Sequence, residues 1–169
     1  MALVSVAMPV REAGPHLSRA LRSILEQTHT NLDVLVIVRP GDAATADVVR
    51  GIAGKDARVR ILERPRPGLA AALNFALREA RSDLVARMDA DDGCSAERIA
   101  TQVAAIDEDP RLAAIGCAFV IKDEATEQEI EVVHPPTDPR EVAWRLMLGN
   151  ILAHGSMVVR RDAVLGVGG

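Results

Sequence analysis

The chain has 169 residues, of which 49% are hydrophobic, and this is enough for one domain with a sizeable core. Its formal charge of −4 provides no general attraction to nucleic acid or to an anionic membrane surface. Only 2% of the residues are aromatic, so platforms for stacking bases or sugar rings are nearly absent. This composition argues against a single-strand nucleic-acid binder and against a lectin that relies on aromatic platforms.

Strands and helices alternate in the first half of the chain. The run LDVLVIV at 32–38 is apolar at every position but one, which predicts a strand buried on both faces of a parallel sheet. Helices are predicted where apolar residues recur at helical spacing. The expected elements are strand Val4–Met8, helix Leu17–Leu25, strand Leu32–Val38, helix Ala43–Ala53, strand Arg58–Leu62, a helix from Gly68 to Ala80, and strand Leu84–Met88.

The second half is less regular. Its expected elements are helix Ala96–Ile106, strands Leu112–Ile121 and Glu129–Val133, helix Pro139–Leu148, and strand Ser156–Val159. Trp144 lies on an apolar helix face, so we expect it in the core or at an interface with a missing segment. No linker, repeat or low-complexity segment divides the chain. The pattern predicts a single α/β domain over 1–169, with a mostly parallel central sheet and helices on both faces.

The location of the protein is predicted from what the sequence lacks. No apolar run approaches membrane-spanning length, and the N-terminus has no basic flank typical of a signal peptide. Cys94 and Cys117 have neither metal-type spacing nor a disulfide framework, so we expect reduced thiols. We therefore expect a cytoplasmic protein with no membrane segment.

Three carboxylates follow the predicted strand at 84–88. Asp89, Asp91 and Asp92 repel one another unless a cation or a positive side chain compensates their charge. Mg²⁺ and Mn²⁺ prefer oxygen ligands and commonly join a carboxylate to substrate phosphates. Open α/β sheets place ligands at the carboxyl ends of their strands. The pattern predicts either a metal–diphosphate site or a solvated acidic turn that caps the next helix.

Six motifs in order, from about Leu3 to Gly169, give the chain a family resemblance. They are Pro9-Val10, Ser23-Ile-Leu-Glu-Gln-Thr28, Gly68-Leu-Ala-Ala-Ala-Leu-Asn74, Arg87-Met-Asp-Ala-Asp-Asp92, Glu97-Arg98 with Gln102, and Asn150-Ile-Leu-Ala-His-Gly-Ser-Met-Val-Val-Arg160. The chain resembles a family 2 glycosyltransferase with the Rossmann-like GT-A fold. The resemblance implies transfer of a sugar, with inversion, from a nucleotide-diphosphate-sugar donor to a saccharide, lipid or protein acceptor, with Mn²⁺ or Mg²⁺ as cofactor.

The resemblance also implies roles for particular residues. The residues expected to bind the donor are Pro9, Val10, Arg11, Arg39, Gly68, Asp89 and Ala90. The expected metal ligands are Asp91, Asp89 and Asp92, with His154 as an additional candidate. The alternative for His154 is a hydrogen-bonded histidine at the start of a strand. Arg64, Arg66 and Arg87 are expected either near the diphosphate or as surface charges. A nucleophilic role for Cys94 is not expected, because no base lies near it in the pattern.

Three departures from the family pattern weaken the expectation of turnover. Arg11-Glu12 stands where family members commonly have Tyr-Asn, and Arg39 stands where an aspartate commonly recognises the base. Because arginine only donates hydrogen bonds, Arg39 is expected to meet a phosphate or a different base, or to lie in an exposed loop. The family's catalytic base lies beyond the position of Gly169, so we expect a domain truncated at its C-terminus.

Two other functions compete with sugar transfer. A non-catalytic nucleotide-sugar-binding or scaffold module would explain Arg39, Glu12 and the missing base. A nucleotidyltransferase shares the fold class, but Arg11-Glu-Ala-Gly14 is a poor version of the loop it requires. Self-association into a homo-oligomer, through apolar surface that a missing segment would cover, is a further expectation.

Overall fold

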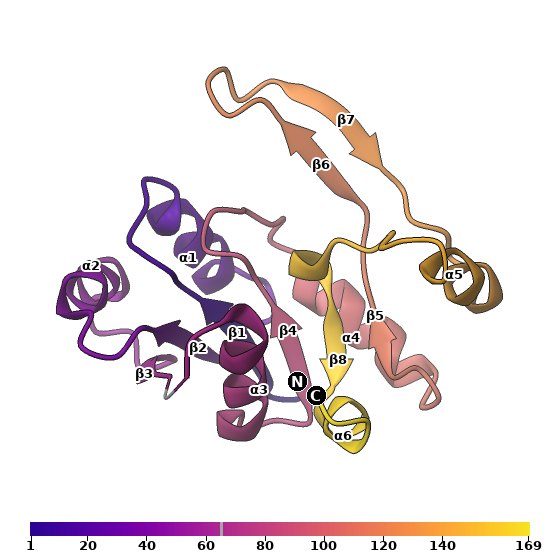
Figure 1. Ribbon diagram of the computed structural model, residues 1–169, viewed down its shortest axis with the longest axis horizontal. Coiled ribbons are helices and arrows are strands. Elements are labelled where there is room, and N and C mark those ends of the chain that lie inside the picture. The colour runs from indigo at the N-terminus through magenta and orange to yellow at the C-terminus, as the bar shows by residue number, and fades with distance from the viewer. Residues whose placement is uncertain (65) are drawn as a thin grey trace.

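The computed structural model describes residues 1–64 and 66–169. Strands and helices alternate in its first half, as predicted, and a hairpin and a short helix extend from its second half (Figure 1). The strands are β1 (Val4–Pro9), β2 (Leu32–Val38), β3 (Val59–Glu63), β4 (Leu84–Arg87), β5 (Ala114–Ile115), β6 (Phe119–Lys122), β7 (Glu129–Val133) and β8 (Val158–Arg160). The helices are α1 (Leu17–Leu25), α2 (Ala43–Ala53), α3 (Leu69–Glu79), α4 (Arg98–Glu108), α5 (Pro139–Leu146), the 3₁₀ turn η1 (His154–Ser156) and α6 (Arg161–Gly166).

The central sheet has six strands in the order β3-β2-β1-β4-β8-β5. Strands β1 to β4 are parallel, whereas β8 runs antiparallel to both β4 and β5. All seven residues of β2 are buried, as expected for an inner strand of a sheet covered on both faces. The predicted mostly parallel α/β sheet is confirmed.

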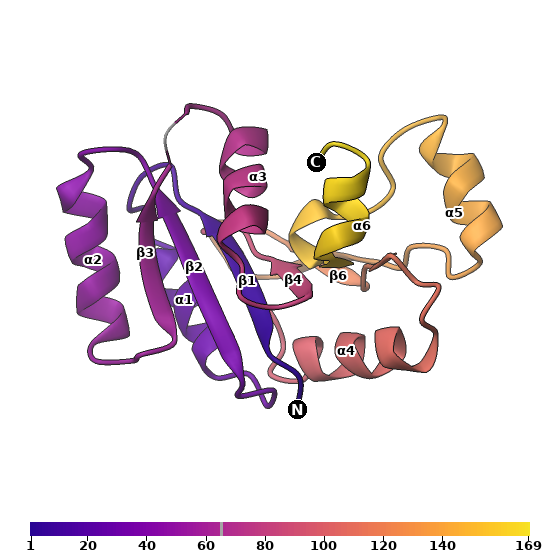
Figure 2. The ribbon, with the colours of Figure 1, turned by 90° about the horizontal axis from the view of Figure 1, so that it is seen from below.

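Helices pack on both faces of this sheet (Figure 2). Alternate residues of β2 point to opposite faces, because side chains of a strand have a period of two. Val34 and Val36 join a core cluster with α1, α2 and α4, whereas Leu35 and Ile37 join a second cluster with α3 and α6. The two clusters fix the carboxyl ends of β1, β2, β3 and β4 along one edge of the sheet.

A polar network is buried on the α3 face of the sheet. The Asp33 carboxylate is 5% exposed and accepts two bonds from Arg60 Nη1, both at 3.1 Å. It also accepts from Ser5 Oγ at 3.0 Å, and the Arg81 backbone N–H donates to it at 3.4 Å. Arg60 Nη1 reaches the Glu79 carbonyl oxygen at 3.2 Å. This network joins β1, β2 and β3 to the C-terminal end of α3.

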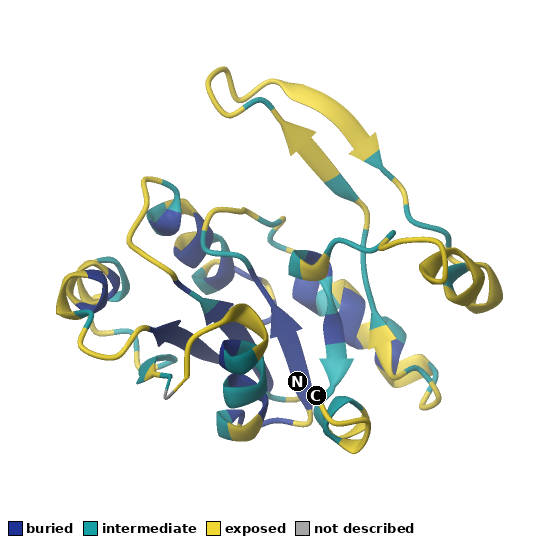
Figure 3. Ribbon diagram, in the orientation of Figure 1, coloured by how far each residue is buried: buried dark blue, intermediate teal, exposed yellow. Residues whose placement is uncertain are grey.

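The segment from β6 to α5 is mostly exposed (Figure 3). The expected single strand at 112–121 is wrong, because the chain leaves the central sheet after Ile115 and pairs with β7 only from Phe119. The expectation of Trp144 in the core is also wrong, since Trp144 is 62% exposed and α5 has no buried residue. The alternative, that Trp144 lies at an interface with a further segment, stays a prediction.

Smaller differences concern element ends. Helix α4 begins at Arg98 instead of Ala96, α5 ends at Leu146 instead of Leu148, and the last strand begins at Val158 after a 3₁₀ turn. Helix α6 was not predicted. Among the helices that the structure describes, none combines the length and apolarity needed to cross a bilayer.

Candidate active site at the carboxyl edge of the sheet

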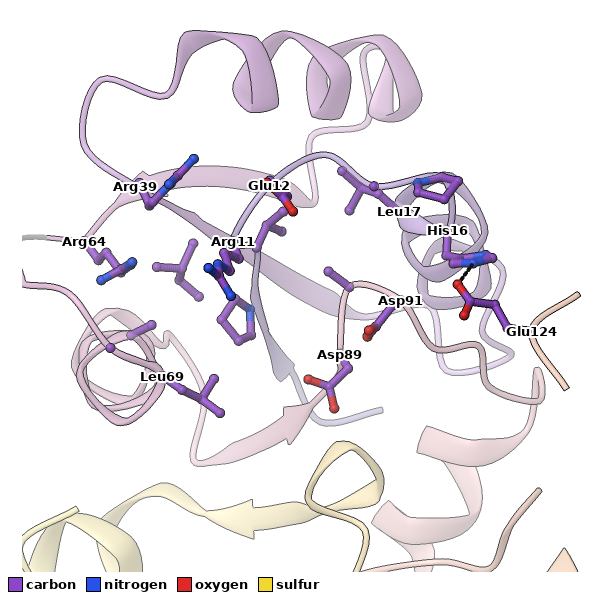
Figure 4. A pocket seen from close by; sticks show the side chains of 18 residues that line it. Arg11, Glu12, His16, Leu17, Arg39, Arg64, Leu69, Asp89, Asp91 and Glu124 are labelled. Carbon is purple, nitrogen blue, oxygen red and sulfur yellow. Dashed lines mark ion pairs between the residues drawn. The ribbon is translucent and has the colours of Figure 1, made fainter. Parts of the chain in front are cut away.

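A cleft of about 650 Å³ opens at the carboxyl ends of the parallel strands (Figure 4). It lies between the loops after β1, β2, β3 and β4 and the N-terminus of α3. All seven residues predicted to bind a donor line it: Pro9, Val10, Arg11, Arg39, Gly68, Asp89 and Ala90. The structure therefore brings together residues that are up to 81 positions apart in sequence.

The N-terminus of α3 faces this cleft through Gly68. Its φ of 104° lies in a region that other residues rarely adopt, and this conformation turns the chain into the helix. No side chain caps this helix, so its first backbone N–H groups lack a side-chain acceptor. A helix N-terminus of this kind favours anions such as phosphate.

The acidic loop begins where β4 ends. Arg87 is buried, and its Nη1 contacts the Asp89 carboxylate. Within residues 1–64 and 66–169, Arg87 Nε is the single buried side-chain polar atom without a hydrogen-bond partner. Arg98 Nη2 donates to the Arg87 carbonyl oxygen at 2.6 Å, which fixes the backbone at the strand end. One internal guanidinium thus offsets part of the charge of three carboxylates.

Backbone from η1 approaches the same carboxylates. A Cβ atom at Gly155 would lie 2.9 Å from Asp89 Oδ2, 3.1 Å from Asp92 Oδ2 and 3.1 Å from Arg87 Nη1. Two carboxylate oxygens and one guanidinium nitrogen therefore meet at one point above Gly155. No side chain other than hydrogen fits there without displacing a charged group.

Burial and charge shift the titration of two groups in this cluster. Partial burial of its carboxyl group, together with the charge of Asp91, raises the pKa of Asp92, although the residue as a whole is exposed. Desolvation, helped by the positive charge of Arg87, lowers the pKa of His154. A lowered pKa keeps the imidazole neutral near pH 7, which is the form that binds metal. The His154 side chain lines neither this cleft nor the neighbouring cavity.

The acidic loop fits a divalent cation that also binds phosphate. The described residues hold no cluster of three or more carboxylate, imidazole or thiolate side chains that would form an all-protein metal cage. Magnesium does not require such a cage, because it is usually bound by one or two carboxylates plus substrate phosphates. Asp89 and Asp91 both line the cleft and provide oxygen donors of the required kind.

A second cavity, of about 850 Å³, lies on the other side of the acidic loop. His16, Asp91 and Glu124 line both spaces, so Asp91 stands between them. The β6–β7 turn contributes residues to the wall of this cavity and is tied to α1. Arg19 Nη1 pairs with Glu127 Oε1 at 2.7 Å. His16 Nε2 lies 3.7 Å from Glu124 Oε1, the pair that Figure 4 marks with a dashed line.

Arg19 joins this turn to the acidic loop, and sequence reasoning missed it. Besides the pair with Glu127, its Nη2 donates to the Asp91 carbonyl oxygen at 3.2 Å. The two partners of the ion pair are 108 positions apart, and no local spacing signals such a contact. The position of the hairpin is therefore linked to the backbone of a predicted metal ligand.

The remaining candidates lie in different surroundings. Arg39 is exposed, as one alternative predicted, and it also lines the cleft. Arg64 lines the cleft as well, whereas Arg66 does not. Cys94 lies near Ser23 and Gln27 in the wall of the second cavity, 3.3 Å from Gln27 Nε2. Neither neighbour is a base that would activate a thiol.

A mostly parallel α/β sheet with an acidic loop and a helix N-terminus at one cleft is the arrangement in which open α/β folds bind ligands. The profile described as "Glycosyl transferase family 2" matches residues 5–166. The chain therefore belongs to glycosyltransferase family 2, as its motifs predicted.

Individual relatives support this assignment. The amylovoran biosynthesis glycosyltransferase AmsE of Erwinia amylovora is 27% identical over 169 residues, covering 98% of this chain and 62% of AmsE. The O-antigen biosynthesis glycosyltransferase WbnJ of Escherichia coli is 26% identical and covers 96% of this chain and 63% of its own length. An uncharacterized glycosyltransferase of Haemophilus influenzae is 30% identical over 61% of this chain and 42% of its own length. The chain thus spans less than two thirds of these relatives.

Solved structures share the fold. The mannosyltransferase PcManGT of Pyrobaculum calidifontis, in complex with GDP-Man and Mn²⁺, superposes with a TM-score of 0.70 at 25% identity, covering 98% of this chain and 46% of that one. Staphylococcus aureus TarS superposes with a TM-score of 0.67 at 17% identity, covering 99% of this chain and 49% of TarS. The expected GT-A fold is confirmed.

Proposed function

We propose that this chain forms the donor-binding part of a glycosyltransferase that transfers a sugar, with inversion, from a nucleotide-diphosphate sugar. The observation that carries the proposal is the cleft in which Asp89 and Asp91 face the free N-terminus of α3. Carboxylates favour a divalent cation, and the helix N-terminus favours phosphate. A cation bound to a diphosphate would therefore interact favourably with both sides of the cleft. The complex of PcManGT with GDP-Man and Mn²⁺ supports a donor and a metal of this kind. Inversion is implied by the family alone.

Asp91 is the proposed principal metal ligand, with Asp89 and Asp92 beside it. A divalent cation bound there would neutralise charge on the departing diphosphate. Arg87 holds the Asp89 carboxylate, and Arg19 holds the backbone at Asp91, so the chain itself keeps these groups oriented. His154 stays an additional candidate ligand.

The second cavity is the proposed acceptor side. It adjoins the cleft at Asp91. The acidic loop separates it from the end of the cleft that is lined by arginines. A saccharide, lipid or protein acceptor could approach from there. The single domain, the homo-oligomer and the cytoplasmic location stay predictions.

The test of this function is metal-dependent nucleotide binding, measured by calorimetry with Mn²⁺ and with a chelator. Asp91→Asn keeps the shape of the side chain and removes its charge, so we expect at least about a ten-fold loss of the Mn²⁺-dependent affinity. Asp47→Asn, on the exposed face of α2, is the control and should bind as the unmodified chain does. Metal-dependent binding that survives in Asp91→Asn would refute the site assignment.

A non-catalytic nucleotide-sugar-binding module is the second candidate. Arg39 and Glu12 favour it, because they stand in the cleft where the family pattern has other residues. Incubation of the chain with a bound donor distinguishes the two functions. Sugar transfer to any acceptor excludes the second candidate, whereas tight binding without transfer by a chain that includes the family's base region supports it.

A further inference from the structure

Three successive parallel strands each lead into an arginine at the cleft. Arg11 follows β1, Arg39 follows β2 directly and Arg64 follows β3 directly; we call these three residues the arginine row. Val38 pairs with Glu63 in the β2–β3 register, so Arg39 and Arg64 leave the sheet side by side. Figure 4 shows the arginine row on one side of the cleft and the acidic pair Asp89 and Asp91 on the other.

Most N–H groups of the arginine row have no acceptor in the described part of the chain. Arg39 Nη2 lies 3.4 Å from Asp42 Oδ2, which is a long contact, and half of the Arg39 side chain is exposed. Arg64 Nη1 donates to the Arg66 carbonyl oxygen at 2.5 Å. In the described part of the chain, the Arg11 guanidinium has no hydrogen bond or ion pair. Because each guanidinium carries five N–H donors, most of them remain available to a ligand.

The position of the row fits the base of a nucleotide. If the diphosphate lies with the metal at the acidic loop, as proposed above, the rest of the nucleotide extends toward β2 and β3. A group beside the arginine row must offer acceptors, because guanidinium groups never accept hydrogen bonds. Two adjacent acceptors on one edge match the planar fork of arginine best.

Guanine matches this pattern better than the other bases. Its O6 and N7 atoms form an adjacent acceptor pair, and arginine bidentate to this pair is the commonest specific contact to a base. Uracil and thymine place the N3–H donor between two carbonyl oxygens, so their acceptors are not adjacent. Cytosine has adjacent acceptors at O2 and N3. Only guanine adds an edge with two donors, N1–H and the 2-amino group, for which the carboxylate of Glu12 in the same cleft is a suitable acceptor.

We propose that the donor of this chain is a guanine nucleotide whose base is recognised by the arginine row, with Arg39 as the main determinant. The proposal rests on the proposed function, since it assumes that the cleft binds a nucleotide diphosphate. It explains why an arginine replaces the aspartate that the family pattern has after β2: the replacement exchanges an acceptor for donors and so changes the base that fits.

The first experiment compares GDP, UDP, CDP, ADP and TDP by calorimetry in the presence of Mn²⁺. We expect GDP to bind at least about ten-fold more tightly than UDP, the size of effect that one bidentate base contact provides. The analogue 7-deaza-GDP replaces N7 by a carbon and should bind about ten-fold more weakly than GDP. This comparison needs no substitution, so folding of a variant does not affect it.

The second experiment identifies the arginine. Arg39→Gln should lower the GDP affinity about ten-fold and leave the weak UDP affinity within a factor of about three. Arg78→Gln, on the exposed surface of α3, is the control and should leave both affinities unchanged. An equal loss for GDP and UDP in Arg39→Gln would show a phosphate contact and overturn the base assignment.

The outcomes separate this inference from the proposed function. If UDP or another nucleotide binds with Mn²⁺ as tightly as GDP or more tightly, the proposed function stands and the guanine assignment falls. If no nucleotide binds with Mn²⁺, the proposed function itself fails, and the assignment fails with it. A GDP preference that is kept with 7-deaza-GDP also refutes recognition through O6 and N7.

Discussion

Replacement of Gly155 by alanine tests whether the carboxylates at the acidic loop form one compact unit. A Cβ atom there would lie 2.9 Å from Asp89 Oδ2, about 0.5 Å closer than an ordinary contact, and 3.1 Å from both Asp92 Oδ2 and Arg87 Nη1. The φ of Gly155 lies outside the positive range, so the backbone itself accepts alanine. Overpacking of this degree typically costs about 1–3 kcal/mol, because the charged groups must separate.

This cost can be measured in two ways. If the carboxylates move, Mn²⁺-dependent nucleotide affinity falls about five-fold or more, since about 1.4 kcal/mol corresponds to a factor of ten. If the carboxylates do not move, the added methyl group destabilises the folded state, and the melting temperature falls by about 2 °C or more. Gly149→Ala is the control, because no atom beyond the adjoining residues lies within 4 Å of its added Cβ. Unchanged affinity together with an unchanged melting temperature in Gly155→Ala would refute the compact arrangement.

Two further predictions concern the buried network and the hairpin. Arg60→Met should lower the free energy of unfolding in urea by about 3 kcal/mol, because Asp33 then remains a buried carboxylate without its cation. Adding Asp33→Asn should restore part of this loss, and no recovery would show that charge is not the cause. Arg19→Ala should change stability by less than about 1 kcal/mol, since its pair with Glu127 is exposed. Amide exchange at 123–128 should nevertheless become faster in this variant, and unchanged exchange would show that the pair does not hold the turn.

The helices and strands of the first half of the fold were predicted from local patterns of apolar residues. The apolar run at 32–38 could only be satisfied by a strand covered on both faces, and the small apolar residues of α3 repeat at helical spacing because they pack against the sheet. The residues after β1, β2 and β4 were expected in one site because of the family resemblance, and they lie together because the carboxyl ends of parallel strands share one edge.

The second half could not be predicted in the same way. The run at 112–121 has the composition of one strand, yet the chain turns away at Gly116 because its two halves pair with different partners. Pairing partners are a non-local choice that composition does not encode. Gly155 belongs to a recognised motif, but its contact with Asp89 depends on the antiparallel register of β8 beside β4. The ion pair of Arg19 depends on where the hairpin folds back.

The exposed segment between β5 and β8 can vary among related proteins without a change in the central sheet. Ile115 and Val158 are paired neighbours in the central sheet, so the chain leaves and rejoins the sheet at adjacent positions. The segment between Gly116 and Ala153 is therefore an excursion from the sheet whose two ends are held close together by this pairing. Segments anchored in this way can be exchanged for others of different length while the strands keep their register. A chimaera that takes this segment from a relative would change the wall of the second cavity and leave the arginine row in place.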